Sequence, residues 1–225
     1  MLLYYITDRS QFPGDENTRR SRLLATIAQA ARCGVDCIQL REKDLSPRDL
    51  EIVARTVVHQ LRTENQKLKT DFLINSRPDI AVATGAQGVH LRSKNDVSPP
   101  EVRKIWTQSG AGASGRVTVG KSCHTRAEVS QAAQEGADFV VFGPVFEKER
   151  GMPVGLESLH EACQEKIPVL ALGGITLENA KPCIQAGAAG IAAIRLFQEN
   201  DMARIVAALR RLKNGVGPQS PDVSQ

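Results

Sequence analysis

The chain has 225 residues, of which 41% are hydrophobic, 24% are charged and 4% are aromatic, and its formal net charge is +4 at pH 7. This composition is ordinary for a globular protein, and so few aromatic residues leave no stacking platform for nucleic acid. No apolar run approaches the ~20 residues that a membrane-spanning helix needs, and the first residues do not resemble a secretory signal. We therefore expect a single-domain cytoplasmic protein that binds neither nucleic acid nor membrane. Its net positive charge suits an anionic substrate.

The chain has five cysteines, an odd number without a C-x-x-C pair. Two of them lie four residues apart, but no second pair completes a zinc site. We interpret the cysteines as reduced thiols that mostly fill the core of a cytosolic protein. They are Cys33, Cys37, Cys123, Cys163 and Cys183.

Short apolar runs alternate with stretches of helical periodicity along the chain. Predicted strands occupy residues 2–6, 35–40, 72–74, 88–91, 117–120, 137–142, 167–172 and 189–194. A polar loop through Asn17 precedes the first helix, and Pro47 suits the first position of the second helix, with Ser46 as its cap. Predicted helices occupy about 23–31, 47–61, 78–83, 156–164, 176–186 and 202–213, and two more are opened by Ser98-Pro99 and by Thr125.

Eight such strand-then-helix units, at a spacing of ~20–35 residues, fit repeated right-handed βαβ crossovers. In a chain of this length they predict an α/β fold, a compact (β/α)8 TIM barrel. We place the barrel, as a single domain, at residues 1–213 and a disordered tail at 214–225, which is rich in Gly, Pro and Ser. The alternative is an open doubly wound sheet, which needs a switch point and usually a G-x-G-x-x-G turn that this sequence lacks.

The run 167–176 is the most informative stretch, because a buried apolar strand ends there in Gly173 and Gly174 just before a predicted helix. Two glycines let an anion approach bare backbone N–H groups at a helix start. The next predicted strand ends at Ile194 and Arg195. Since TIM barrels often bind phosphate at the loops after strands 7 and 8, we predict a phosphate site at these two strand ends. The alternative is that the glycines only form a tight turn.

Polar residues also stand at or near the predicted carboxyl ends of the other strands, where a TIM barrel carries its catalytic groups. Each has a simpler interpretation. Arg41 and Lys43 could be a solvated loop, and Asn75 could form a turn through its own side chain. The complete set is Arg41, Lys43, Asn75, His90, Ser122 and His124.

The two histidines of this set differ in their surroundings. His90 lies inside an apolar strand, so we interpret it as a structural histidine whose hydrogen bonds are satisfied. His124 follows Gly-Lys-Ser-Cys just after a predicted strand and can titrate near neutrality. We expect Lys121 to lower the pKa of His124 further. His124 is therefore the better catalytic candidate.

Seven motifs at these strand ends occur in register with one family of enzymes. From about residue 3 to 198, the chain resembles the thiamine phosphate synthase/TenI family. The resemblance implies a TIM barrel that acts on thiazole phosphate in vitamin B1 synthesis. The motifs are Tyr5-Ile6-Thr7-Asp8, Ile38-Gln39-Leu40-Arg41-Glu42-Lys43, Ile74-Asn75, Gly88-Val89-His90-Leu91, Ser122-x-His124, Gly143-Pro144-Val145-Phe146 and Leu172-Gly173-Gly174-Ile175-Thr176.

The synthase branch of the family joins a hydroxymethylpyrimidine diphosphate to thiazole phosphate and releases pyrophosphate, with Mg²⁺. Cations and hydrogen-bond donors suit a leaving pyrophosphate, because negative charge develops there. The resemblance implies a diphosphate site made by Arg41, Lys43, Asn75 and Ser122. It implies a thiazole phosphate site made by Gly173, Gly174, Ile194 and Arg195.

The chain departs from the synthase pattern at the metal positions. The synthase pattern has an aspartate directly after the asparagine, where this chain has Ser76. Asp96 lies one residue away from the position of a second metal aspartate, so it is the metal ligand that the resemblance offers here. The serine expected after the last strand is Arg195. Because Mg²⁺ prefers oxygen ligands, the loss of a carboxylate weakens the case for metal-assisted diphosphate chemistry.

The TenI branch is similar to this chain at the same points, including an Asn-small-Arg-x-Asp-Ile-Ala run at 75–81. Its members tautomerise a thiazole carboxylate phosphate without metal, and the implied proton shuttle is His124. We therefore predict a thiazole tautomerase that needs no cofactor. One alternative is a thiamine phosphate synthase in which Asp96, alone or with Asp44 or Glu147, holds Mg²⁺. Another is a non-catalytic regulator that binds thiamine intermediates, and a homo-oligomer is left open in each case.

Overall fold

The computed structural model describes residues 1–64, 70–94, 97–110, 116–146 and 152–214. Within these ranges, eight parallel strands form a closed barrel in which each strand pairs with the next and β1 pairs with β8. The strands are β1 (Leu2–Ile6), β2 (Cys37–Leu40), β3 (Asp71–Asn75), β4 (Gly88–Leu91), β5 (Thr118–Cys123), β6 (Phe139–Phe142), β7 (Val169–Ala171) and β8 (Gly190–Ala193).

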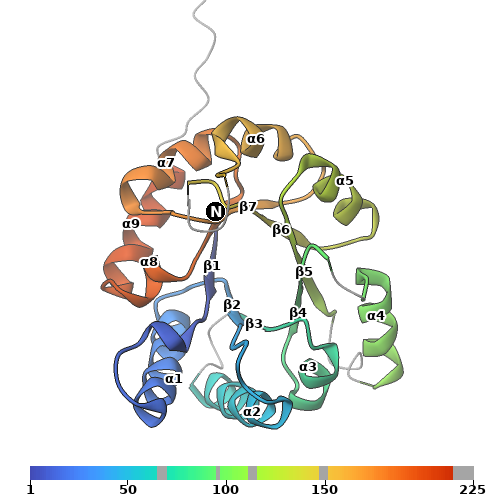
Figure 1. Ribbon diagram of the computed structural model, residues 1–225, viewed down its shortest axis with the longest axis vertical. Coiled ribbons are helices and arrows are strands. Elements are labelled where there is room, and N and C mark those ends of the chain that lie inside the picture. The colour runs from blue at the N-terminus through green and yellow to red at the C-terminus, as the bar shows by residue number, and fades with distance from the viewer. Residues whose placement is uncertain (65–69, 95–96, 111–115, 147–151, 215–225) are drawn as a thin grey trace, which may run out of the picture.

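Helices follow the strands and form a ring around them, as Figure 1 shows. The fold is therefore the predicted (β/α)8 TIM barrel, and the doubly wound alternative is wrong because the sheet closes between Leu2 and Gly190. The helices are α1 (Glu16–Arg32), α2 (Pro47–Glu64), α3 (Pro78–Thr84), α4 (Pro99–Gln108), α5 (Arg126–Gln134), α6 (Gly155–Ala162), α7 (Leu177–Gln185), α8 (Arg195–Gln198) and α9 (Met202–Asn214), with a 3-10 turn η1 (Arg9–Gln11).

Local capping chemistry sets several helix starts. The side chain of Asp15 accepts a hydrogen bond of 2.8 Å from the backbone N–H of Thr18, so α1 begins at Glu16 and the predicted loop through Asn17 is too long. Thr176 caps α7 as expected, and Asn179 completes the reciprocal capping box. These caps place each helix start directly after the loop that leaves the barrel rim.

Strand residues alternate between the inside of the barrel and the layer between strands and helices. The interior cluster includes Tyr4, Leu73, Phe139, Val141 and Leu170, and the outer layer of strand and helix side chains forms a separate, larger cluster. Every residue of β2, β4, β6 and β8 is buried, which explains why these strands read as apolar runs without alternation.

The structure differs from the sequence prediction at two places that matter for the site. Strand β5 continues to Cys123, so Ser122 lies within the strand and not in a loop after it. The short helix α8 begins directly after β8 and was not predicted. Helix α9 reaches Asn214, one residue beyond the predicted barrel, and the rest of the predicted tail, 215–225, lies outside the described residues.

All five cysteines are free, as expected for reduced thiols. Among the helices in the described ranges, none combines the length and apolar character that a bilayer crossing requires.

Candidate active site

The predicted site residues gather at one end of the barrel. Because all strands of the barrel are parallel, the residues at or just after their carboxyl ends share a single rim. Lys43 follows β2, His124 follows β5 and Gly174 follows β7, so these three belong to the same rim. The predicted metal ligand Asp96 lies outside the described residues.

A pocket of about 370 Å³ opens where β7 and β8 end. Its lining includes all four residues of the predicted phosphate site, namely Gly173, Gly174, Ile194 and Arg195. Helix α8 starts at Arg195, and the first N–H groups of a helix have no partner within it. Two strand-end loops and the start of a short extra helix are the arrangement that binds phosphate in many TIM barrels. The unpredicted helix therefore begins within the lining of the predicted site.

The Gly173-Gly174 turn is built against the loop that follows β6. Gly173 has φ +99°, and a Cβ there would lie 2.5 Å from the Cα of Pro144. The carbonyl of Gly173 accepts a hydrogen bond of 3.0 Å from the backbone N–H of Phe146, and that of Leu172 accepts one of 2.7 Å from Val145. Only glycine suits this backbone conformation and close approach, so the turn has a structural role beside any ligand-binding one.

His124 is an exposed side chain at the rim, directly after β5. Its Nδ1 contacts the carbonyl oxygen of Gly143, which follows β6. A carbonyl oxygen can only accept, so Nδ1 carries a proton and, in the neutral ring, Nε2 has the free lone pair. The backbone N–H of His124 donates to a carboxylate oxygen of Glu128 at 2.6 Å. The first contact holds the ring and leaves Nε2 as its basic nitrogen, and the second holds the backbone of His124.

The expectation that Lys121 assists His124 does not fit the geometry. Along β5, Ser122 points into the barrel, where it contacts His90, and Lys121 therefore points outward. The ammonium of Lys121 forms an ion pair of 2.8 Å with Glu135 at the end of α5. Lys121 thus stabilises the packing of α5 on the barrel.

Gln39 and Asn75 meet inside the barrel near the ends of β2 and β3. The Nε2 of Gln39 donates a hydrogen bond of 2.9 Å to the Oδ1 of Asn75, which fixes the Asn75 amide with its NH₂ group as the remaining donor. Gln39 is 1% exposed, and its Oε1 has no hydrogen-bond partner among the described residues. Sequence analysis did not select Gln39, although a glutamine inside a buried strand is an unusual residue.

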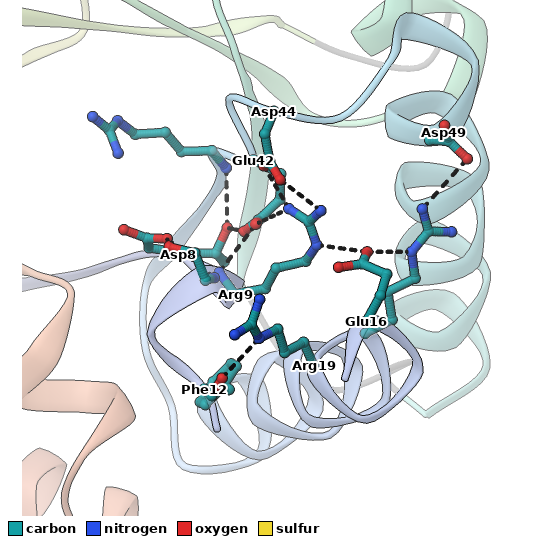
Figure 2. A network of polar contacts seen from close by, with 12 residues as sticks. Asp8, Arg9, Phe12, Glu16, Arg19, Glu42, Asp44 and Asp49 are labelled. Carbon is teal, nitrogen blue, oxygen red and sulfur yellow. Dashed lines mark hydrogen bonds and ion pairs between the residues drawn. The ribbon is translucent and has the colours of Figure 1, made fainter. Parts of the chain in front are cut away.

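The loop after β2, which carries Arg41 and Lys43, is anchored by a buried polar network (Figure 2). The Thr7 hydroxyl accepts a hydrogen bond of 3.0 Å from the backbone N–H of Arg41 and donates one of 2.5 Å to Glu42. The other carboxylate oxygen of Glu42 accepts from the backbone N–H of Arg9 at 3.0 Å and from its guanidinium at 3.1 Å. Arg9 and Glu42 are only 4% and 5% exposed, so Glu42 anchors the loop, whereas Arg41 is half-buried and Lys43 is exposed.

Two further carboxylates complete the contacts of Arg9. Asp44 accepts two hydrogen bonds from the guanidinium, at 2.7 and 2.9 Å, and Glu16 at the start of α1 accepts a third at 2.9 Å. Figure 2 shows the guanidinium between these acids. The contact with Arg9 lowers the pKa of Asp44, so this carboxylate stays ionised and bound to Arg9.

The described rim does not fit a Mg²⁺ site of the kind that the synthase resemblance implies. Ser76 stands at the position of the metal aspartate, and its buried hydroxyl has no hydrogen-bond partner among the described residues. Asp44, which was one candidate ligand, already makes its bidentate contact with Arg9. Over the described ranges, no three His, Cys, Asp or Glu side chains are grouped as metal ligands. The other candidates, Asp96 and Glu147, lie outside those ranges.

His90 is a buried histidine with both ring nitrogens in hydrogen bonds, as predicted for a structural residue. It is 2% exposed, and it contacts the hydroxyls of Tyr4 at 3.0 Å and Ser122 at 2.9 Å. Burial, and next the positive charge of Arg41, lower the pKa of His90 to about 3. The ring is therefore neutral at physiological pH.

This low pKa predicts a specific acid sensitivity. Below pH 6.5 the unfolded chain protonates His90 and the folded protein does not, so folding stability falls as the pH drops from 6.5 towards 3. We subtract the unfolding free energy of His90→Gln from that of the wild type at each pH. This difference should be about 2 kcal/mol lower at pH 5 than at pH 7. Urea titrations of both proteins at each pH measure this difference, and a difference that does not change with pH contradicts the prediction.

Comparison with known proteins agrees with this architecture. A family model described as thiamine monophosphate synthase matches residues 3–197. A provisionally named thiamine-phosphate synthase from Geobacter sulfurreducens is 41% identical over 197 residues, covering 85% of this chain and 84% of the relative. The thiamine-phosphate synthase of Methanoculleus marisnigri is 36% identical over 220 residues, covering 95% and 94%.

Among solved structures, the thiamine phosphate pyrophosphorylase of Pyrococcus furiosus superposes with a TM-score of 0.76 at 27% identity, covering 95% of both chains. Sequence motifs, barrel topology and the matched relatives agree over nearly the whole described chain. The chain belongs to the thiamine monophosphate synthase family and is an enzyme of thiamine biosynthesis.

Proposed function

We propose that the protein binds thiazole phosphate with its phosphoryl group in the pocket at the ends of β7 and β8. This proposal is supported by the joint placement of Gly173, Gly174, Ile194 and Arg195 around one pocket. Arg195 contributes a positive charge, and the start of α8 contributes backbone donors. A cytoplasmic location is part of the same proposal.

The reaction that the rim geometry supports best is a metal-independent thiazole tautomerisation with His124 as the proton shuttle. The observation that carries it is the contact of His124 Nδ1 with the Gly143 carbonyl, which leaves Nε2 as the basic nitrogen. The imidazole takes a proton from one position of the thiazole and returns one at another, so substrate and product are isomers. An imidazole suits both steps because its two nitrogens can accept and donate a proton. The engagement of Asp44 by Arg9 also favours this reaction over a metal-assisted one.

The second candidate is thiamine phosphate synthase, and the names of the relatives favour it over the tautomerase. In that reaction Arg41, Lys43, Asn75 and Ser122 would bind the pyrimidine diphosphate. Arg41 and Lys43 leave the barrel on an anchored loop, which suits the positioning of an anion. Mg²⁺ would neutralise diphosphate charge, and Asp96 is the ligand that the sequence offers for it. A non-catalytic binder of thiamine intermediates is the third candidate.

One experiment on the wild-type protein separates these candidates. The purified protein is given thiazole carboxylate phosphate alone, and separately pyrimidine diphosphate with thiazole phosphate, each with Mg²⁺ or with EDTA. We expect isomerisation of the carboxylate substrate that EDTA does not reduce, followed by NMR, and no release of pyrophosphate. Mg²⁺-dependent pyrophosphate release would reject the tautomerase and support the synthase. Binding of thiazole phosphate without either reaction would support the non-catalytic alternative.

A further inference from the structure

A chain of three hydrogen-bonding side chains runs from the closed interior of the barrel to its rim. The hydroxyl of Tyr4 lies 3.0 Å from Nδ1 of His90, and Nε2 of His90 lies 2.9 Å from the hydroxyl of Ser122. Tyr4 is 0% exposed and His90 is 2% exposed, whereas Ser122 is partly exposed at the end of β5. We call these three residues the relay.

The relay is held by close packing in the interior. The ring of Phe139 packs edge-on against Tyr4, with centroids 5.3 Å apart. Gly120 provides the space for this arrangement, because a Cβ there would lie 2.5 Å from the Phe139 ring and 2.9 Å from His90 Nδ1. The His90 ring therefore cannot turn away from Tyr4 and Ser122 without a change in packing.

The relay contains three mobile protons for two hydrogen bonds, one each on Tyr4, neutral His90 and Ser122. In one arrangement Tyr4 donates to Nδ1, Nε2–H donates to Ser122, and the Ser122 proton is left over. In the other, Ser122 donates to Nε2, Nδ1–H donates to Tyr4, and the Tyr4 proton is left over.

Burial decides between these arrangements. Among the described residues, the Tyr4 hydroxyl has no hydrogen-bond partner besides His90, and burial raises the pKa of Tyr4, so its proton stays. The second arrangement would leave that proton unpaired in the barrel interior, which is strongly disfavoured. The first leaves the Ser122 proton at the rim, where water or a ligand can accept it.

We propose that Tyr4 and His90 are positioning residues that keep the Ser122 hydroxyl as a hydrogen-bond donor towards an anionic oxygen of the substrate. The acceptor is a phosphoryl or carboxylate oxygen, since both occur in the substrates considered above. The effect on substrate rests on the proposed function. The tautomer of His90 does not depend on the proposed function, because it follows from the structure of the ligand-free protein alone.

The first test measures this tautomer by nitrogen-15 NMR of the histidine-labelled, ligand-free protein at neutral pH. A His90→Gln variant identifies the His90 signals among the four histidines. We expect Nδ1 to resonate as an unprotonated nitrogen and Nε2 as a protonated one. A protonated Nδ1 would overturn the proposal whether or not the protein turns over any substrate.

The second test measures whether Tyr4 acts through Ser122. In Tyr4→Phe neither tautomer of His90 pairs Nδ1, because its hydrogen-bond partner is gone. The preference for Nε2–H that Tyr4 imposes is therefore lost, so Nε2 can accept from Ser122 and withdraw its proton from the ligand. Thiazole carboxylate phosphate and pyrophosphate are each titrated by calorimetry. We expect at least one of the two ligands to bind about 2- to 10-fold more weakly to this variant than to the wild type. In a Ser122→Ala background, the same change should have no further effect.

Tyr5→Phe is the matched control, because the neighbouring Tyr5 hydroxyl donates to Gln198 at 3.2 Å on the outer side of the strand. This variant should bind both ligands as the wild type does. Equal weakening by Tyr4→Phe with and without Ser122 would show a purely structural role and would overturn the proposal. Unchanged binding of both ligands by Tyr4→Phe would overturn it as well.

Discussion

Replacing His124 by asparagine is expected to slow thiazole tautomerisation by about 10²- to 10⁴-fold, the usual contribution of a general acid–base group. The asparagine NH₂ group can still donate to the Gly143 carbonyl, so the local backbone is retained. What is lost is Nε2, the nitrogen that we propose exchanges the proton. Binding of thiazole phosphate should stay within about 2-fold, because the phosphate pocket lies at the ends of other strands. Steady-state kinetics and calorimetry measure the two quantities.

His160→Asn is a matched control for this prediction. His160 is also exposed, and its Nδ1 also contacts a backbone carbonyl, that of Ala186 at 3.1 Å, but it lies on α6 beside the end of α7. That position is away from the rim, so the variant should keep full activity. A His124→Asn protein with wild-type turnover would remove His124 from the mechanism.

Replacing Glu42 by alanine is expected to lower the free energy of unfolding by about 3–5 kcal/mol, the usual cost of breaking a buried ion pair. The carboxylate of Glu42 accepts from the Thr7 hydroxyl and from both the backbone and the guanidinium of Arg9. All of these donors are buried, and the substitution leaves them without that acceptor. Urea denaturation followed by circular dichroism measures the loss.

Glu51→Ala is the control for Glu42→Ala. Glu51 forms an exposed ion pair with Arg55 one helical turn away on α2, and such pairs contribute little. We expect this variant to lose less than about 0.5 kcal/mol. A loss below about 1 kcal/mol in Glu42→Ala would mean that Asp44 and Glu16 alone satisfy Arg9, contrary to our interpretation of the network.

The barrel could be predicted because its strands and helices are marked by local features. Buried strands appear as apolar bursts, and caps such as Ser46 with Pro47 mark helix starts. Helix α8 was missed because it has four residues and continues directly from an apolar strand. The end of β5 was placed too early because Lys121 and Ser122 are polar. Their polarity is explained by partners that are distant in sequence, Glu135 and His90.

Some parts of the candidate site could likewise be predicted from local sequence, and others could not. The Gly-Gly turn and the end of β8 were predicted from local sequence, and the fold brings them to one pocket. The anchoring of Arg41 was not predicted, because Glu42 lies more than 30 residues along the chain from both Thr7 and Arg9. In a sequence, such charged residues are indistinguishable from solvated ones. The catalytic and binding roles themselves remain predictions that the experiments above test.

The loop after β6 has a consequence for the geometry of catalysis. Its first residue, Gly143, holds the His124 ring through a carbonyl, and its next residues bond to the carbonyls of Leu172 and Gly173 beside the phosphate pocket. The separation between imidazole and pocket is therefore set by main-chain atoms. Exchanging the Val145 or Phe146 side chain would leave these main-chain hydrogen bonds, and so the distance between imidazole and pocket, unchanged. Substrates would then be selected by the distance between their phosphoryl group and their acidic proton.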